Sequence, residues 1–376
     1  MKIRTITTGF NLKLPVDEEQ IKSIAEFNHK AMKEFKRSGY QVQTTRIATQ
    51  PWQNYFKSKK QIVNVAKELQ RLTSKYKIDF FNMGTTFDNI SESYYIIKNT
   101  GSGFCTASLC DNKSVNYDTA KKTAALIKKL ARIEDGGFAN LRFAALFNTK
   151  AGNPFFPAAY HKGPISFAIG TENSDIVYKA FSKAKNIEKA GTVLKQMLEK
   201  EYKKIENIAK KISKKERIKY DGIDVSIATS VHPHESVAFA FEKLGLGKFG
   251  EAGTLAVAAE VTKTLRQLDV KKCGYSGLML PVLEDYGLAH RNKKDNYNIF
   301  NLLLYSAVCG TGLDTIPLPG NVSEKKLYAL LLDIASLSIK LNKPLSARLM
   351  PVPGKKARIM THYNFEYFVN SKTMKI

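Results

Sequence analysis

The first 48 residues read MKIRTITTGFNLKLPVDEEQIKSIAEFNHKAMKEFKRSGYQVQTTRIA (Met1–Ala48) and contain a strand–helix–strand pattern. Polar and apolar residues alternate over Lys2–Phe10, which predicts a β-strand, and Tyr40–Ala48 predicts a second one. Between them, Asp17 is a typical N-terminal cap of a helix, and Gly39 predicts where that helix ends. Two strands joined by a helix usually lie parallel, so this stretch favours an α/β fold.

The same alternation continues along the chain and predicts eight strands separated by helices. The six further strands are expected at Ile78–Met83, Leu141–Phe147, Ile165–Ile169, Ile223–Thr229, Gly277–Leu283 and Leu345–Val352. Right-handed crossovers then predict a mainly parallel sheet, either doubly wound or closed into a barrel wrapped by helices. No Pro/Gly/Ser-rich linker divides the chain, so we expect a single domain over residues 1–376.

The composition is that of an ordinary globular protein, with 43% hydrophobic and 25% charged residues. No stretch approaches the roughly 20 apolar residues of a membrane span, and the N-terminus does not read as a signal peptide. We therefore expect a cytoplasmic protein without a membrane partner. The four cysteines are neither numerous enough for a disulfide framework nor spaced for zinc: Cys105, Cys110, Cys273 and Cys309. No metal is expected, and no cofactor is indicated.

The net charge of +25 by itself suggests nucleic acid. Most of this charge is lysine on helical stretches such as Glu201–Arg217, and a lysine-bearing outer helix face is usually just solvated. There is no basic stripe interleaved with aromatic residues, and no nucleic-acid-binding motif. We expect no specific nucleic-acid partner; whether the chain forms a homo-oligomer stays open.

Four of the eleven arginines fall inside predicted strands or at their ends: Arg4, Arg46, Arg142 and Arg348. A strand arginine among apolar neighbours must be paired or face a polar cavity, because burying an unpaired charge costs several kcal/mol. The guanidinium fork suits carboxylates and phosphates. Two interpretations stay open: structural pairing with Asp or Glu, or an anion site built from several of these arginines.

Three histidines stand in loops that suit a site. His232 and His234 lie in SVHPHES (Ser230–Ser236), between a predicted strand and a helix, where sites assemble in α/β folds. They are suited to proton exchange, but two histidines make an incomplete metal shell. The aromatic loop NPFFPAAYH (Asn153–His161) could wall a pocket with His161 at its rim. Helix capping and ordinary loop packing are the alternatives.

Further candidates stand where predicted strands end or glycines allow tight turns. Glu284 and Asp285 directly follow the strand GLMLPVL, and Cys309 lies in SAVCGTGLDTIPLPG together with Asp314. An inert buried cysteine is the alternative for Cys309. The glycine-rich GLGKFGEAG is not a dinucleotide fingerprint, because it follows a predicted helix and not a strand.

Several segments together resemble one family, the uncharacterised protein family numbered 0210, also called domain of unknown function 711. The resemblance spans nearly the whole chain and rests on IRTIT (Ile3–Thr7), PFFPAAYH (Pro154–His161), EAGTLAVAA (Glu251–Ala259), GYSGLMLPVLED (Gly274–Asp285), CGTGLDTIPLPG (Cys309–Gly320) and RLMPVPGKKA (Arg348–Ala357). By this resemblance, the chain is expected to lack a C-terminal extension that bacterial members carry. No established activity comes with the family.

The family's fold is similar to the ten-stranded α/β barrel of pyruvate formate-lyase and of anaerobic ribonucleotide reductase. The resemblance therefore implies two parallel half-barrels around a central site. It does not imply radical chemistry, because glycyl-radical enzymes carry R-x-x-G-Y near the C-terminus and Thr361–Ile376 contains no glycine. The nearest lookalike, Arg37-Ser38-Gly39-Tyr40, lacks one spacer residue, and its glycine is better explained as a helix cap.

The leading hypothesis is an enzyme that acts on a small anionic metabolite, a carboxylate or phosphate, in a central barrel site without glycyl-radical chemistry. A non-catalytic metabolite sensor or regulator with the same pocket is the alternative. The residues expected to contact the ligand are Arg4, Arg46, Arg348, Glu284 and Asp285. The residues expected to act in catalysis are His161, His232, His234, Cys309 and Asp314.

Overall fold

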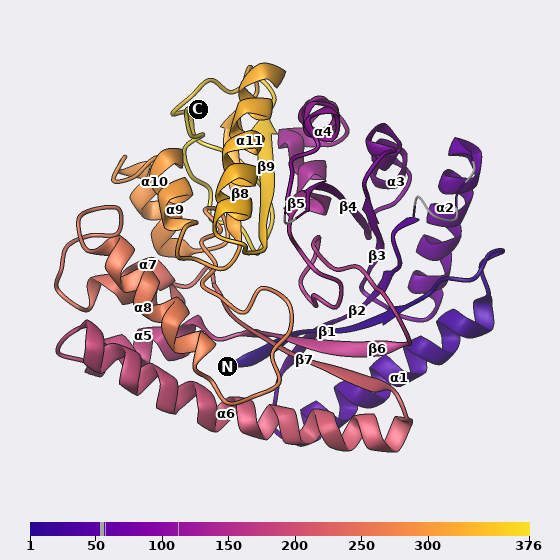
Figure 1. Cartoon of the computed structure of the whole chain (residues 1–376), viewed down its shortest axis with the longest axis horizontal. Helices are drawn as coiled ribbons and strands as arrows, with labels where there is room; N and C mark the ends of the chain where they lie inside the picture. Colours follow the sequence, from indigo (N-terminus) through magenta and orange to yellow (C-terminus); the bar gives the residue numbers. More distant parts are fainter. Residues whose placement is uncertain (53–55, 57, 112) are drawn as a thin grey trace.

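Nine strands form one sheet in the part of the chain that the computed structural model describes, residues 1–52, 56, 58–111 and 113–376 (Figure 1). Their order in the sheet is β7-β6-β1-β2-β3-β4-β5-β9-β8. The strands are β1 (Lys2–Phe10), β2 (Val42–Thr49), β3 (Phe80–Thr86), β4 (Gly103–Cys110), β5 (Phe143–Phe147), β6 (Ser166–Glu172), β7 (Lys219–Ala228), β8 (Gly312–Pro319) and β9 (Leu345–Val352).

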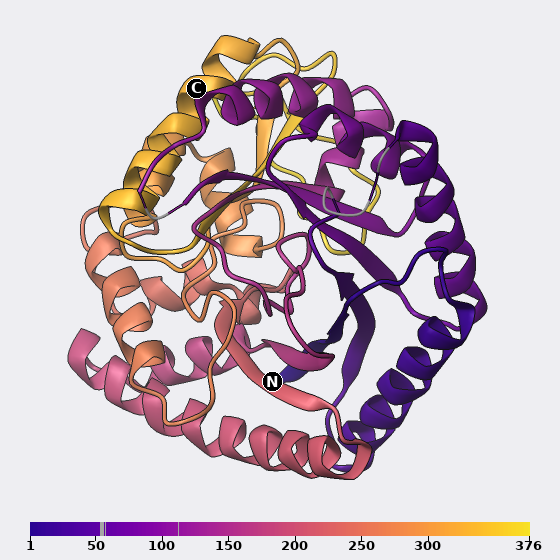
Figure 2. The same ribbon diagram turned by 45° about the vertical axis from the view of Figure 1, so that its right-hand side comes forward.

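Helices surround the curved sheet on its outer side, and the strands enclose the interior (Figure 2). They are α1 (Glu18–Arg37), α2 (Lys59–Lys75), α3 (Ser93–Lys98), α4 (Tyr117–Leu130), α5 (Ser174–Lys183), α6 (Ile187–Glu216), α7 (Val237–Glu242), α8 (Thr254–Arg266), α9 (Tyr286–Lys293), α10 (Ile299–Tyr305) and α11 (Glu324–Lys340). Short 3₁₀ helices are η2 (Ile90–Glu92), η3 (Asp135–Arg142) and η4 (Pro233–Glu235). Among the described residues, none of the helices has both the length and the apolar character of a membrane span.

The caps of α1 are those that the sequence predicts. The Asp17 carboxylate accepts a hydrogen bond from the Gln20 backbone N–H, and the helix ends at Ser38. Gly39 follows with φ of +87°, the left-handed conformation that glycine adopts at no steric cost. The glycine-rich Gly245–Gly253 lies between α7 and α8, as expected for a helix–helix connection.

Most neighbouring strands are parallel, which confirms the predicted α/β class and mainly parallel sheet. Strands β1 to β5 form a continuous parallel block. The pairs β6–β7 and β8–β9 are also parallel, and each is joined to the block by one antiparallel contact, β1–β6 on one side and β5–β9 on the other. The sheet therefore consists of parallel groups that run in opposite directions.

No tenth strand closes the sheet among the described residues, and the predicted strand Gly277–Leu283 is wrong. The chain at 272–281 makes only isolated bridges, Ile223↔Lys272 and Ile227↔Leu278 to β7 and Pro281↔Asp314 to β8. Pro281 has no N–H to donate to a neighbouring strand. The N–H groups of Tyr275 and Ser276 instead donate to the Asp224 carboxylate at 2.8 and 2.9 Å.

Two glycines let this segment pass close to the residues before β8. A Cβ on Gly277 would lie 2.4 Å from the Cα of Gly310, and the reverse distance is the same. The Gly310 N–H donates to the Leu278 carbonyl at 2.7 Å. Only glycine at both positions allows two backbones to approach this closely.

Two strands escape prediction from the sequence. Strand β4 has the sequence GFCTASLC, which is rich in small and weakly polar residues. Strand β8 (GLDTIPLP) contains two prolines, which favour a loop interpretation. Proline is tolerated there because β8 is the last strand of the sheet, where one side needs no ladder hydrogen bonds.

The alternation of side chains along each strand separates the core from the interior. Ile47 packs in the main apolar cluster between sheet and helices, whereas its neighbour Arg46 lines the interior cavity. On β9, Leu349 likewise packs in the main apolar cluster, and its neighbour Arg348 lines the cavity. Because successive residues of a strand point to opposite faces, an arginine beside an outward-facing apolar residue must point inward.

Candidate functional site

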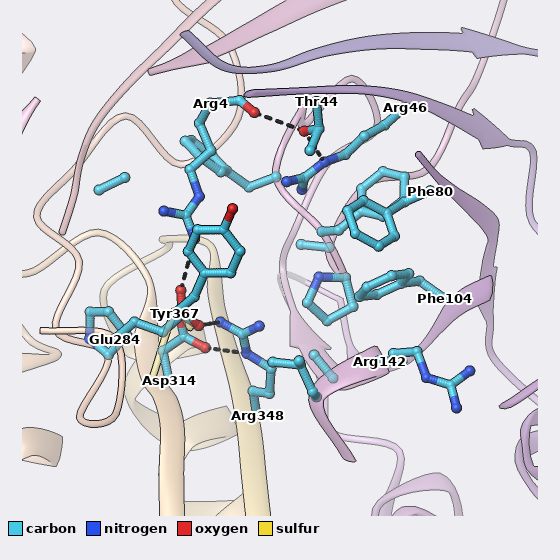
Figure 3. A pocket seen from close by; sticks show the side chains of 18 of the residues that line it. Arg4, Thr44, Arg46, Phe80, Phe104, Arg142, Glu284, Asp314, Arg348 and Tyr367 are labelled. Carbon is cyan, nitrogen blue, oxygen red and sulfur yellow. Dashed lines mark hydrogen bonds and ion pairs between the residues drawn. The ribbon is translucent and has the colours of Figure 1, made fainter. Parts of the chain in front are cut away.

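A cavity of about 540 Å³ lies inside the curved sheet. Eight of the nine described strands contribute to its lining, all except β6. The loop between β5 and β6 reaches into the interior and adds Phe155, Phe156, Pro157 and Ala158 to the wall. The volume falls in the range of about 300–1,000 Å³ that is typical of small-molecule sites. Figure 3 shows Arg4, Arg46 and Arg348 around this cavity, each from a different strand.

Arg46 presents an unpaired guanidinium to the cavity. Its Nε atom donates to the Thr44 hydroxyl at 3.0 Å, and the guanidinium carbon lies 5.4 Å from the ring centre of Phe80 and 5.2 Å from that of Phe156. Within the described part of the chain, Arg46 forms no ion pair, and its two terminal nitrogens have no hydrogen-bond acceptor. The guanidinium is thus held through its Nε atom and by contact with two aromatic rings, and its two terminal nitrogens stay free to donate.

Burial, and next the nearby guanidinium of Arg4, lower the pKa of Arg46 to about 9. Arg46 therefore still carries its charge at pH 7, but in surroundings that do not fully compensate it. A bound anion would supply that compensation.

The other two arginines belong to a chain of alternating charges. It runs from Glu172 through Arg4 (2.9 Å) to Glu284 (3.2 Å), then through Arg348 (2.6 Å) to Asp314 (2.7 Å). We call these five residues the ion-pair chain. Two carboxylates flank each of its arginines, so Arg4 and Arg348 have the structural pairing that is one of the two interpretations of the sequence.

The charges of the ion-pair chain stabilise one another. Burial alone would raise the pKa of Glu172, but Arg4, Gln43 and Lys2 outweigh it, and the pKa is lowered. Burial alone would lower the pKa of Arg348, but Asp314 and Glu284 outweigh it, and the pKa is raised. Both groups stay ionised, which fixes the charges of this wall at neutral pH.

The fourth strand arginine has a structural role in the wall. Arg142 donates through Nη1 to the carbonyl oxygens of Thr100 and Gly103, at 2.6 and 3.3 Å, and through Nη2 to Glu134. Both terminal nitrogens of its guanidinium are therefore occupied by groups of the protein.

The structure brings five predicted site residues together at the cavity: Arg4, Arg46, Arg348, Glu284 and Asp314. Five others lie outside it. His232 and His234 are exposed on and beside η4, where His234 Nδ1 lies 3.3 Å from the Tyr178 hydroxyl. Cys309 is buried in the main apolar core. The cavity geometry gives their predicted roles no support.

Asp285 serves as a buried anchor between two helices. Its carboxylate accepts from the Ser236 hydroxyl at 2.6 Å and from the N–H groups of Val237 and Leu288 at 2.7 and 2.9 Å. It thereby caps α9 and ties it to the start of α7. Glu284, its neighbour in sequence, instead faces the cavity.

His161 packs against Gly9 of β1 and does not line the cavity. Its Nε2 atom lies 2.8 Å from the Gly163 carbonyl oxygen, and its side chain fills the space left by Gly9. The sequence predicts the wall loop correctly, since Phe155 and Phe156 line the cavity, but the histidine at its end turns away.

Replacing His161 with Gln should reduce the pH dependence of stability. Burial lowers the pKa of His161 in the folded state, so the unfolded chain binds the proton more tightly. Stability is therefore lost as the pH falls below about 6.5, the pKa of unfolded histidine. In urea unfolding at pH 7.5 and 5.5, the variant should lose less stability between the two pH values. An equal loss in both proteins would contradict the assignment.

Several residues of the site have no clear signal in the sequence. Glu172 ends a buried strand, and only its position beside Arg4 reveals its part in the ion-pair chain. Phe80 reads as an ordinary apolar residue in a predicted strand, and Phe104 lies in β4, which the sequence does not predict. The ring centre of Tyr367 lies 5.8 Å from the Arg4 guanidinium carbon, and Tyr367 belongs to an irregular C-terminal segment. The one sequence pattern that indicates a special role for Glu172 is an acidic residue in a strand that is otherwise largely apolar.

No group of three or more His, Cys, Asp or Glu side chains is placed to hold a metal ion in the part of the chain that is described.

Fold and cavity define an α/β protein with a large, mostly parallel sheet wrapped by helices and an arginine-lined interior. The chain belongs to the family described as "Uncharacterised ACR (DUF711)", which matches residues 1–364 and confirms the predicted family.

The relatives of the chain carry the name UPF0210 protein. One from Acetivibrio thermocellus is 28% identical over 253 residues, which is 64% of this chain and 56% of that protein. Another from Pyrobaculum aerophilum is 28% identical over 345 residues, 85% of this chain and 75% of that protein. The match to the Acetivibrio relative thus spans little more than half of its length. Among solved structures, an anaerobic ribonucleotide reductase is similar with a TM-score of 0.49 and 12% identity, over 99% of this chain and 76% of the other.

Proposed function

We propose that this chain binds a small organic anion, a carboxylate or a phosphate, in the interior cavity, and that Arg46 is the residue that holds the anionic group. The observation that supports this most strongly concerns the two terminal nitrogens of Arg46, which have no hydrogen-bond acceptor among the described residues. A guanidinium held by Thr44 and two phenyl rings, without a carboxylate partner among the described residues, is costly to keep unless a ligand uses it.

The segment 272–281 takes the place of a tenth strand in this proposal. Its bridges to β7 and β8 connect the two edges of the open sheet, and Tyr275, Met279 and Pro281 line the cavity. The family resemblance to a ten-stranded barrel supports this view of the segment as the closing wall.

Conversion of the bound anion is a second candidate function, and Asp314 favours it. One carboxylate oxygen, Oδ1, accepts from Arg348 Nε, while Oδ2 has no hydrogen bond among the described residues. A cavity-facing carboxylate with a free oxygen can accept a proton from a substrate. If the chain does not catalyse, the same binding serves a sensor or regulator.

Arg46→Gln should weaken binding of an organic acid about 10- to 150-fold, because charge-assisted hydrogen bonds contribute about 1.5–3 kcal/mol each. Arg46→Lys should also weaken it, since an ammonium cannot present a planar fork. Titration calorimetry with hexanoate measures both. Arg37→Gln, in an exposed arginine paired with Glu34, is the matched control and should leave affinity unchanged. Equal affinity in the wild type and Arg46→Gln would rule out the proposed site.

A further inference from the structure

The cavity offers a ligand one uncompensated positive charge. Arg46 has no ion pair among the described residues, whereas Arg4 and Arg348 each bind two carboxylates of the ion-pair chain. A ligand with one negative charge can therefore be matched fully by the Arg46 fork. A second negative charge would find only guanidinium groups that are already neutralised.

Part of the polar wall is acidic, and we call this part the acidic wall. It consists of Asp79, Glu284 and Asp314, whereas Glu366 lines the cavity on its solvent-exposed side. A dianion placed against Arg46 would bring its second charge toward these carboxylates in an enclosed space, where like charges repel more strongly than in water. The wall thus disfavours phosphates and dicarboxylates.

The remaining wall is apolar and largely aromatic. Phe104 packs edge-on against Phe80 and Phe156, with ring centres 5.6 and 5.1 Å apart, and so continues the aromatic surface that holds Arg46. Ala144, Ala158 and Met279 extend this surface farther into the interior. Small side chains beside large rings leave room for the body of a ligand, and burying an apolar body is favourable.

We infer that the cavity selects monocarboxylates with an apolar or aromatic body over phosphates and dicarboxylates. This inference rests on the proposed function, because it assumes that Arg46 receives the anionic group. It narrows the ligand class from any small anion to a singly charged organic acid whose other end is apolar.

The test is titration calorimetry of the full chain at pH 7.5 with two series of probes. The first series is acetate, butanoate, hexanoate and 3-phenylpropanoate; the second is succinate, phenyl phosphate and inorganic phosphate. Affinity should rise about fourfold for each methylene that becomes buried, so hexanoate should bind about 15-fold more tightly than butanoate. The dianions should bind at least about tenfold more weakly than hexanoate. Hexanamide, the uncharged analogue, should also bind at least about tenfold more weakly.

The outcomes separate this inference from the proposed function. Phosphate or succinate binding as tightly as hexanoate, and lost in Arg46→Gln, would overturn the inference and leave the anion site standing. Equal affinities for acetate, butanoate and hexanoate would overturn the claim that the cavity prefers a ligand with an apolar body. Absence of binding by every probe in both series would overturn both proposals.

Discussion

Replacing Arg348 with Met should lower the free energy of unfolding by about 3 kcal/mol. Arg348 bonds Glu284 at 2.6 Å and Asp314 at 2.7 Å, and the three side chains are 9%, 14% and 16% exposed. Removing the guanidinium leaves two poorly solvated carboxylates close together without a counter-charge, and breaking a buried pair in this way costs about 3–5 kcal/mol. Because water in the cavity can reach these carboxylates, we expect a loss of stability at the lower end of this range.

Urea unfolding at pH 7.5 measures this loss, and two variants calibrate it. Arg348→Lys keeps the charge but not the fork that spans both carboxylates, so it should fall between the wild type and Arg348→Met. Arg37→Met removes an exposed pair with Glu34 and should cost about 0.5 kcal/mol or less. A loss in Arg348→Met no greater than in Arg37→Met would show that the ion-pair chain does not stabilise the wall.

Replacing Glu284 with Gln should reduce the preference of the cavity for singly charged ligands. Glu284 accepts from Arg4 Nη2 and from Arg348 Nη2, so it neutralises part of both arginines. A neutral amide of the same shape removes the excess negative charge of the ion-pair chain, and each arginine then keeps one carboxylate, Glu172 for Arg4 and Asp314 for Arg348. Succinate and inorganic phosphate should then bind about tenfold more tightly than in the wild type, because one new charge-assisted hydrogen bond contributes about 1.5–3 kcal/mol.

Calorimetric titration of wild type and Glu284→Gln with succinate, phosphate and hexanoate tests this change in selectivity. Glu366→Gln is the matched control, since Glu366 also lines the cavity but is exposed to solvent, where charge effects are screened. It should change dianion affinity by less than about threefold. Unchanged dianion affinity in Glu284→Gln would mean that the acidic wall does not set selectivity.

The part of the site that sequence could predict is the part that strand alternation determines. Arg46 stands next to Ile47 and Arg348 next to Leu349, and each apolar neighbour packs against the helices. Once the strands are placed in one curved sheet, these arginines must point to a shared interior. The convergence of Arg4, Arg46 and Arg348 on the cavity follows from local pattern and fold class together.

The sequence could not predict in the same way which carboxylates pair with which arginines. Glu284 reaches both Arg4 and Arg348 although it is 280 and 64 residues away in sequence. These long-range ion pairs determine which arginine has no carboxylate partner. The spacing of residues in the sequence does not indicate them. The sequence therefore left structural pairing and anion binding open, and the structure shows pairing for three of the four strand arginines, Arg4, Arg142 and Arg348, and none for Arg46 among the described residues.

The directions of the side chains in the loop Asn153–His161 could also be predicted only in part. Phe155 and Phe156 line the cavity as the aromatic pattern predicts, but His161, five residues beyond Phe156, turns to fill the space beside Gly9. The direction of a loop side chain depends on which neighbour leaves room for it, which is a property of tertiary packing. The strand missed at β8 has a similar origin, because its prolines are acceptable only at the edge of the sheet.

The most direct test of the central claim, that Arg46 holds the anionic group of a ligand, is a crystal structure of the full chain with 3-phenylpropanoate. The two carboxylate oxygens should lie about 3 Å from the terminal nitrogens of Arg46, with the phenyl ring against the Phe104 wall. A carboxylate bound instead at surface lysines, or at Arg4 and Arg348 with the Arg46 fork unoccupied, would contradict the account.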